Sequence, residues 1–494
     1  MRSISMEQMM NLKMLKSLFQ RSADVIFQQY KFQQHTVHMI TCDAMIDEEL
    51  LQTVVVERVQ SLFNSGSDET LEELIEQHLH VPYLQKVMKK EDIITRVYKG
   101  HVLLYFEEDH LIYSSDISNR PNREPGETTL ELVVKGPRDD FIEDVFINIA
   151  LLRKRLPTNS FSVETLEIGQ RSKTTVAVLY MEDIVNLNML EQIRLQLQKI
   201  DTDIVVNGDL LMEAIEQTAK VLPRHDYTGR PDFALQALMR GRILIMIDGV
   251  SYAMIIPANI MLLFKTSEDN EYPIIVSSME RVLRIFGILI SMLLPGFWLA
   301  VTTYHQEQLP YLLLATVVES RTGLPFPTIL EIMMMLFMFE MFREANLRLP
   351  SAISGSISVV GGLIIGDAAI KAGVTSPSMI VIIAISSIAA FTLVNQAFVT
   401  AMSIFRLIII LFSAFLGLFG FFISVFFIIL YAANMRVLGV PYINFSADYD
   451  KGDIGKSLLR LSPKSYSLRP PFLKPQDRTR TATNKAKKIR VSDR

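Results

Sequence analysis

The sequence predicts a multidomain membrane protein. We expect an N-terminal soluble α/β (α+β) cytoplasmic domain of two duplicated subdomains, an α-helical transmembrane bundle and a basic C-terminal tail. Charged residues make up 21% of the 494 residues, yet nearly all long uncharged runs lie beyond Arg284. Two pairs of segments in the first half repeat at nearly one spacing. Residues 435–494 carry 14 Lys and Arg against 5 Asp and Glu.

The first half is expected to remain in the cytoplasm. Its single cysteine, Cys42, excludes an internal disulfide framework and fits a reducing compartment. Residues 1–20 are amphipathic and interrupted by Lys13 and Lys16. They lack the continuous apolar core and small-residue cleavage site of a signal peptide.

The first half also carries a pattern typical of a duplication. Residues 36–50 resemble 175–190, because each segment has a strand-like run, an acidic residue and a helix-like pattern. Residues 100–113 resemble 241–254 as glycine-led hairpins. The two pairs are offset by 139 and 141 residues, which favours two tandem copies of about 140 residues. Chance similarity between generic strands is the alternative.

Residues 243–264 are apolar enough to pass for a membrane helix, but we predict a buried hairpin. Asp248 and Gly249 form a two-residue turn signal between runs rich in Ile and Val. An aspartate in mid-membrane would also cost about 3 kcal/mol. The matching segment 100–113 has charges in its turn and is clearly soluble.

The second half contains five apolar runs that are candidate membrane segments. They are 285–304, 325–342, 353–372, 377–396 and 407–434. Basic flanks stay in the cytoplasm, so both ends of the bundle face inward and the number of crossings is even. We expect four crossings plus one re-entrant or buried helix at 353–372. A six-crossing alternative would recruit 308–320.

These considerations give a complete division of the chain. We expect cytoplasmic subdomain 1 (1–135), a linker helix (136–156), cytoplasmic subdomain 2 (157–280), a transmembrane helical domain (281–434) and a basic cytoplasmic tail (435–494).

The run 353–372 carries candidate polar residues for gating. Asp367 and Lys371 are four apart, so they share a helix face and can form an ion pair. Ionisable residues at membrane depth usually face a bundle interior or a water-filled path. Three glycines would permit close helix packing: Gly361, Gly362 and Gly366. The alternative is an interfacial helix whose charges reach lipid headgroups.

The run 325–342 adds three more candidate polar or gating residues. Glu331 and Glu340 are nine apart, which places them on opposite sides of one helix. Glu340 can pair with Arg343, and an interfacial position would also explain Glu340. Glu331 is the stronger candidate for a functional role.

No enzyme chemistry is predicted. The sequence has no Gly-rich phosphate loop and no zinc-type Cys/His cluster, so we expect no catalytic, cofactor-binding or metal-binding residues. The basic tail suits solvent or anionic headgroups better than RNA, so no nucleic-acid partner is expected.

Several motifs together resemble one family. They are "GRPDFALQALMRGRILIMIDG" (229–249), "LPGFWLAVTTYHQEQLP" (294–310), "RTGLPFPTILE" (321–331), "FREANLRLPSAISGSISVVGGLIIGDAAIKAGVTSP" (342–377) and "GVPYINF" (439–445). They resemble the A subunits of GerA-type spore germinant receptors over about residues 36–480.

The resemblance implies an integral protein of the spore inner membrane that takes part in nutrient sensing. Its partners would be a transporter-like B subunit, a C-type lipoprotein, membrane lipid and further copies of the chain in a homo-oligomer. Germinant binding to a partner subunit would then open an ion-release channel formed by this chain.

Two alternatives remain open at this stage. The chain could be an accessory paralogue of the stage V sporulation AF type, which amplifies germination. A secondary transporter is less favoured, because the second half shows no inverted repeat.

Overall fold

The computed structural model of the chain describes residues 10–33, 35–64, 70–119, 137, 139–216, 221–348, 366–393, 395–443, 459–461 and 468–480. It divides into two compact units. The α/β part comprises Met1–Ala219, Tyr227–Pro257 and Ser467–Arg494, and the helical part comprises Lys220–Asp226 and Ala258–Tyr466. Residues 258–280, expected in subdomain 2, thus belong to the helical part.

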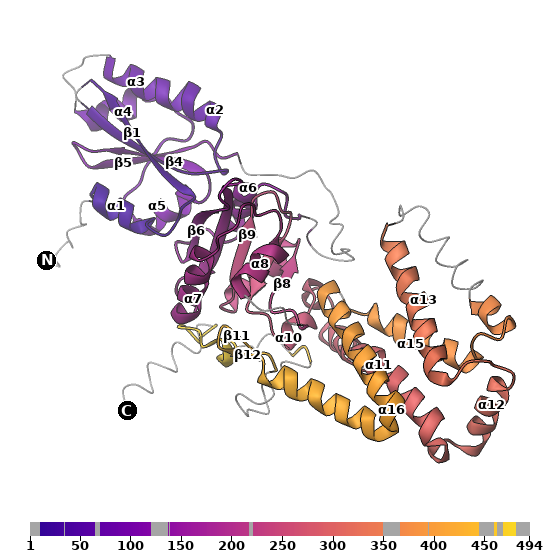
Figure 1. The fold of residues 1–494 in the computed structure, drawn as a ribbon. Helices are drawn as coiled ribbons and strands as arrows, with labels where there is room; N and C mark the ends of the chain where they lie inside the picture. The colour runs from indigo at the N-terminus through magenta and orange to yellow at the C-terminus, as the bar shows by residue number, and fades with distance from the viewer. Residues whose placement is uncertain are drawn as a thin grey trace, which may run out of the picture. The chain divides into compact units, whose positions relative to one another are not determined.

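The first α/β subdomain is a five-stranded sheet in the order β1-β2-β4-β5-β3 with helices on both faces (Figure 1). Its elements are α1 (Leu12–Leu18), β1 (Val25–Phe32), β2 (His35–Cys42), α2 (Glu48–Leu50), η1 (Leu51–Val56), α3 (Glu57–Asn64), α4 (Leu71–His78), β3 (Gln85–Lys86), α5 (Lys90–Val97), β4 (His101–Phe106) and β5 (Leu111–Asp116).

Strand alternation divides the core of this subdomain into two layers. Val37 and Met39 of β2 pack in one cluster with η1, α3 and α4. Ile40 and Cys42 pack in the other with α1 and α5. Successive side chains of a strand point to opposite faces, so β2 is buried on both sides.

The second α/β subdomain repeats this topology, with strand order β6-β7-β9-β10-β8. Its elements are α6 (Val145–Arg155), β6 (Phe161–Ile168), β7 (Thr174–Met181), α7 (Leu187–Gln198), α8 (Gly208–Glu216), β8 (Asp226–Thr228), α9 (Pro231–Met239), β9 (Ile243–Ile247) and β10 (Ala253–Ile256). Two sheets with the same order of strands confirm the predicted duplication. The expected linker helix is α6.

The hairpin predicted over 241–254 is present, but the prediction of a two-residue turn is wrong. Residues 248–252 connect β9 to β10. The Asp248 N–H donates to the Thr175 carbonyl at 2.9 Å, and the Gly249 N–H donates to the Glu143 carbonyl at 2.7 Å. The connection is therefore five residues long, not the two that the sequence signal suggested.

Arg153 of α6 joins the two subdomains. Its guanidinium is fully buried and forms two hydrogen bonds with Asp24, at 2.7 and 2.9 Å. It also donates to the Phe161 carbonyl at 2.6 Å. Its Cζ lies 4.1 Å from the ring centroid of Tyr98 and 4.5 Å from that of Phe161. The Ala23 N–H donates to the Val163 carbonyl at 3.1 Å, so a short stretch of backbone pairing accompanies the ion pair.

Part of the expected tail packs on the second α/β subdomain. Gln476 donates its main-chain N–H to Ile184 at 3.0 Å and its side-chain amide to Val185 at 2.9 Å. Leu473, in the short helix η6 (Pro471–Leu473), is 1% exposed. Residues 468–480 are therefore a packed segment, whereas the basic composition favoured contact with solvent or anionic headgroups.

The helical part contains α10 (Ile260–Leu263), η2 (Ser267–Asn270), α11 (Ile274–Tyr304), η3 (Gln306–Gln308), α12 (Tyr311–Arg321), α13 (Thr328–Arg348), α15 (Pro377–Ala390), α16 (Gln396–Asn434), β11 (Arg436–Val437) and β12 (Val440–Pro441). Among the described residues, α11 and α16 are long and apolar enough to cross a membrane by length and composition. Most of the expected re-entrant segment 353–372 lies outside the described residues.

The 39-residue α16 is a helical hairpin, not the single span predicted over 407–434. Gly417 has φ 60° and ψ −140°, which breaks the helix into legs 396–416 and 418–434. The rings of Phe405 and Tyr431 lie 6.2 Å apart across the two legs. Figure 1 shows the two legs meeting at a sharp turn. A run of apolar residues cannot reveal this break, because glycine is common in membrane helices.

The hairpin extends alongside α11. At its start, Asn395 donates to Asp226 at 2.7 Å and the Phe398 ring lies 5.9 Å from that of Phe264. At its turn, the Tyr304 hydroxyl donates to the Ala414 carbonyl at 2.6 Å. The first leg therefore runs from the segment that precedes α11 to the end of α11.

Candidate functional site

Two ionisable residues of α13, the buried Glu331 and the partly exposed Glu340, face different neighbours. Glu331 approaches the start of α15, and Glu340 approaches the middle of α16. The two side chains point to different partners, as their nine-residue spacing predicted. Gly361 and Gly362 lie outside the described residues, so the structure does not place them.

The Glu331 carboxylate sits in a cradle of hydrogen-bond donors. Its Oε1 accepts from the Ser376 main-chain N–H at 2.6 Å, the Ser376 hydroxyl at 2.6 Å and the Thr375 hydroxyl at 3.0 Å. Its Oε2 lies 4.0 Å from the Arg321 guanidinium and has no hydrogen-bond partner among the described residues. Glu331 is 1% exposed, so the carboxylate is enclosed by protein.

Two prolines position this cradle. Pro377 is the first residue of α15, where its fixed φ suits a helix start, and the N-cap Ser376 accepts from the Met379 N–H at 3.3 Å. Pro327 precedes α13, and its carbonyl accepts from the Glu331 N–H at 3.1 Å. Glu331 therefore lies in the first turn of one helix and against the N-terminus of another. Both helix starts favour a negative charge there.

Glu340 belongs to a second polar network, about 13 Å further along α13. It accepts from Arg406 of α16 at 2.6 Å and from Ser403 at 3.3 Å, and its other oxygen lies 2.7 Å from Arg343. Arg406 also reaches the Ser386 hydroxyl of α15 at 3.5 Å. The expected pairing of Glu340 with Arg343 is present, and the network extends to two more helices.

The sequence analysis missed Arg406 as a functional candidate. It is the one charged residue of α16, and its side chain is 6% exposed. A lone charge inside a long apolar run was the available signal, since such residues usually face a bundle interior.

Asp367 and Lys371 form the ion pair that their spacing predicted. The Lys371 Nζ lies 2.6 Å from Asp367 Oδ2 in the helical stretch 366–371. Their side chains are 59% and 74% exposed within the single chain, so neither is buried in the bundle as described.

Among the described residues, close helix packing depends on two glycines of α11, and the predicted roles of Gly361 and Gly362 are not tested. A Cβ added at Gly366 would meet nothing within 4 Å among the described residues. A Cβ at Gly287 of α11 would meet the Ala389 carbonyl at 2.9 Å and the Thr392 hydroxyl. A Cβ at Gly296 would collide with Ile409 of α16. The small residues of α11 therefore let α15 and α16 approach it closely.

A buried cluster of charges precedes the apolar stretch of α11. Asp269 accepts from Arg281 at 2.6 Å and also from Arg284. Burial alone would raise the pKa of Asp269, but Arg284 and Arg281 outweigh burial and hold that pKa below its usual range. Ser277 donates to the Asp269 carbonyl at 2.8 Å. The cluster fixes the short helix η2 to the start of α11.

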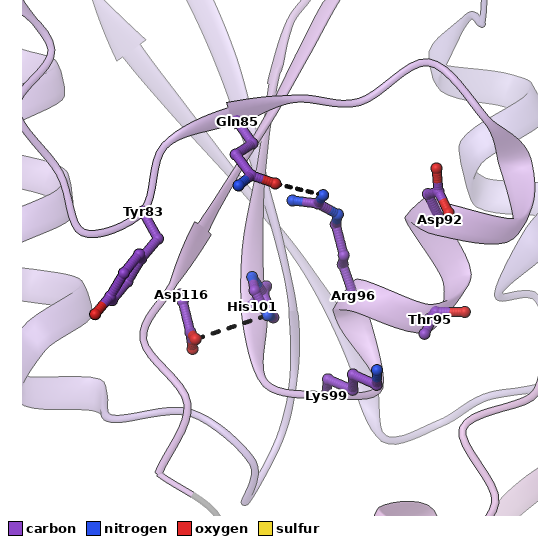
Figure 2. Close-up of a pocket in the computed structure, with 8 residues that line it drawn as sticks. All are labelled: Tyr83, Gln85, Asp92, Thr95, Arg96, Lys99, His101 and Asp116. Atoms are coloured by element: carbon purple, nitrogen blue, oxygen red, sulfur yellow. Dashed lines mark hydrogen bonds and ion pairs between the residues drawn. The ribbon is translucent and has the colours of Figure 1, made fainter.

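The first α/β subdomain has a shallow hollow of about 400 Å³ (Figure 2). Its lining residues are Tyr83, Gln85, Asp92, Thr95, Arg96, Lys99, His101 and Asp116. Arg96 donates to Gln85 at 2.6 Å, and His101 lies 3.9 Å from Asp116. These groups are paired with one another, so we assign the hollow no ligand. The described residues contain no group of three or more His, Cys, Asp or Glu suited to a metal ion.

Comparison with known proteins gives consistent matches over most of the chain. The family described as "Bacillus/Clostridium GerA spore germination protein" matches residues 13–472. "Spore germination protein XA" of Bacillus anthracis is 38% identical over 451 residues, which cover 91% of this chain and 92% of that protein. "Spore germination protein KA" of Bacillus subtilis (strain 168) is 27% identical over 465 residues, covering 93% and 85%.

A solved structure is also similar to this chain. It is the N-terminal domain of the A subunit of the Bacillus megaterium spore germinant receptor GerK3, with 22% sequence identity and a TM-score of 0.38. The match covers 49% of this chain and 92% of that structure.

Proposed function

Because the chain belongs to the GerA family of Bacillus and Clostridium spore germination proteins, we propose that it is the A subunit of a nutrient-responsive germinant receptor. We further propose that its helical part forms an ion-release channel as a homo-oligomer. A germinant would bind a transporter-like B subunit, and a C-type lipoprotein would complete the receptor. Germinant binding would then favour one of two states of the bundle.

The observation that carries the channel proposal is the set of ionisable residues enclosed by apolar helices. Glu331 and Arg406 are both more than nine-tenths buried. A charge at membrane depth costs about 2.5–3.5 kcal/mol even by insertion scales, so such residues usually serve an ion pathway or a switch. Asp367 and Lys371, exposed within one chain, would face the path or a neighbouring copy. These residues are the candidate gating positions.

We propose that the helical part crosses the membrane an even number of times. Residues 227–257 and 468–480 flank it, and both belong to the α/β part. A chain that leaves and re-enters one compact unit returns to the same side of the membrane. The legs of α16, of about 31 and 25 Å, suit a hydrocarbon core of about 30 Å and would cross in opposite directions.

We place the protein in the spore inner membrane with the α/β part and residues 468–480 in the cytoplasm. The surplus of basic residues in 435–494 supports this orientation. The four crossings plus one re-entrant or buried helix expected from sequence remain a proposal. The legs of α16 would cross twice where the sequence predicted one span, so an even total requires that one other expected span does not cross or that the segment expected to be re-entrant also crosses.

Deletion of the gene tests the receptor proposal. Potassium and dipicolinate release would be followed from spores of the deletion strain and its parent across a panel of single nutrients. We expect loss of the response to one nutrient class, with other responses unchanged. A uniform slowing with every nutrient would instead support the accessory role. An unchanged response to all nutrients, in a strain lacking other receptors, would contradict both.

A further inference from the structure

The cradle around Glu331 has the chemistry of an anion-binding site. Every described group that faces the carboxylate is a donor or a cation: the Ser376 N–H and hydroxyl, the Thr375 hydroxyl and the Arg321 guanidinium. Thr375 and Ser376 are each 1% exposed. They stand at the N-terminus of the 14-residue α15, where main-chain N–H groups and the helix dipole favour anions.

The present occupant fills this cradle incompletely. Oε1 of Glu331 accepts three hydrogen bonds. Its Oε2 is buried with no hydrogen-bond partner among the described residues. The nearest guanidinium nitrogen, on Arg321, is 4.0 Å away, which is beyond hydrogen-bond distance. The backbone of α13 fixes the reach of this side chain. A free carboxylate has no such tether and could turn both oxygens toward donors.

We infer that the start of α15, with Thr375, Ser376 and Arg321, is a binding site for small carboxylate anions, and that the side chain of Glu331 occupies it in this structure. Glu331 is then a tethered ligand that holds α13 against α15. Movement of α13 away from α15 vacates the site and lets a carboxylate from solution enter. This inference does not depend on whether the bundle conducts ions.

Truncation of the tethered ligand provides the test. Glu331→Ala removes Cγ, Cδ and the two carboxylate oxygens, which is the heavy-atom set of acetate. The full-length chain would be purified in detergent, and its thermal midpoint would be measured in sodium acetate and in sodium chloride of equal ionic strength and pH. We expect acetate to raise the Tm of Glu331→Ala by a few degrees in a saturable manner.

Two controls separate a specific site from a general salt effect. Wild-type protein and Glu331→Gln, whose side chain still fills the cradle, should show no saturable difference between acetate and chloride. Adding Thr375→Val and Ser376→Ala to Glu331→Ala removes two donor hydroxyls. The acetate concentration that gives half of the Tm shift should then rise at least tenfold. If acetate shifts Glu331→Ala and the wild type equally, the inference is wrong.

Poor folding of the truncated variant would still give an answer. The yield of monodisperse Glu331→Ala would then be compared after extraction in acetate and in chloride. Recovery in acetate alone supports the site, and equal failure in both salts contradicts it. Because the readouts are stability and yield, failure of the channel proposal would leave the result unaffected.

Discussion

Phe405 and Tyr431 lie on the two legs of α16, 26 positions apart, yet their ring centroids are separated by only 6.2 Å. On a straight helix the two residues would be about 39 Å apart. The contact therefore shows that α16 folds back on itself at Gly417. The Tyr304 and His305 side chains pack against that turn, so the hairpin is fixed to the end of α11.

Gly417→Ala should destabilise the helical part. A Cβ there would meet His305 at 2.9 Å and Tyr304 at 3.0 Å, and it would force a non-glycine residue to φ 60°. With ψ at −140°, this backbone conformation is one that essentially only glycine adopts, and the strain alone costs about 1–3 kcal/mol. Gly373→Ala is the matched control, because Gly373 has φ 64° with nothing within 4 Å. Thermal unfolding should place Gly417→Ala below Gly373→Ala, and equal midpoints would contradict the packing described at the turn.

In the Arg153→Met variant, the two α/β subdomains should unfold or separate more readily than in the wild type. It leaves the Asp24 carboxylate buried without its partner, which costs about 3–5 kcal/mol. Arg155→Met, on the same helix, removes a partly exposed pair with Asp139 and should cost less than about 1 kcal/mol. Denaturant unfolding of the full-length chain compares the two variants. Similar losses of unfolding free energy in the two variants would show that Arg153 does not hold the subdomains together.

The Cys42 thiol should be unreactive in the folded chain. Burial, with the Asp24 charge as a lesser cause, raises the pKa of Cys42 well above its usual value. An unfolded thiol ionises near pH 8.5, so the stability that Cys42 contributes is present below about pH 8.5 and declines as the pH rises further. Reaction with a thiol reagent at pH 8 should track unfolding.

Cys42 is the only cysteine, so Cys42→Ala gives the blank for that measurement. Arg153→Met should accelerate the reaction, because Arg153 and Cys42 both contact Asp24. Immediate stoichiometric reaction of the folded wild type would contradict the burial of this thiol.

Glu340 and Arg406 should show strong coupling in stability. Arg406→Met removes the cation that Glu340 bonds at 2.6 Å, and Glu340→Met leaves Arg406 buried in an apolar bundle. Breaking one partner of a fully buried pair costs about 3–5 kcal/mol, and the loss here should be smaller because the Glu340 side chain is 34% exposed. Replacing both partners by apolar residues is often close to neutral. A double-mutant cycle in thermal unfolding measures this difference. Additive losses would mean that the two side chains do not act as a pair.

The sequence predicted the α/β part well because its signals are local. The strand-like run around Val37 and the repeat offset of about 140 residues predicted two similar sheets. Helix patterns in the second half were also visible. The position of each charge in that bundle was not, because Glu331 and Ser376 are 45 residues apart and meet only after α13 and α15 pack.

Two errors have the same physical origin. The turn at Gly417 depends on side chains of α11, and the packing of residues 468–480 depends on the loop near Val185. Composition correctly identified the segment around Gly417 as apolar and the C-terminal segment as basic. It could not report their tertiary partners, and those partners determine where a long apolar run bends and whether a basic tail is packed.

The most direct test of the channel claim measures potassium release from spores against nutrient concentration, for wild type, Asp367→Ala and Lys371→Ala at matched levels of the assembled protein. The exposed i,i+4 pair contributes only about 0.3–0.5 kcal/mol, so assembly should survive both substitutions. We expect the maximal rate of potassium release to change while the half-maximal nutrient concentration stays the same. A wild-type rate with a shifted nutrient dependence would contradict conduction through this chain and would place nutrient binding on it instead.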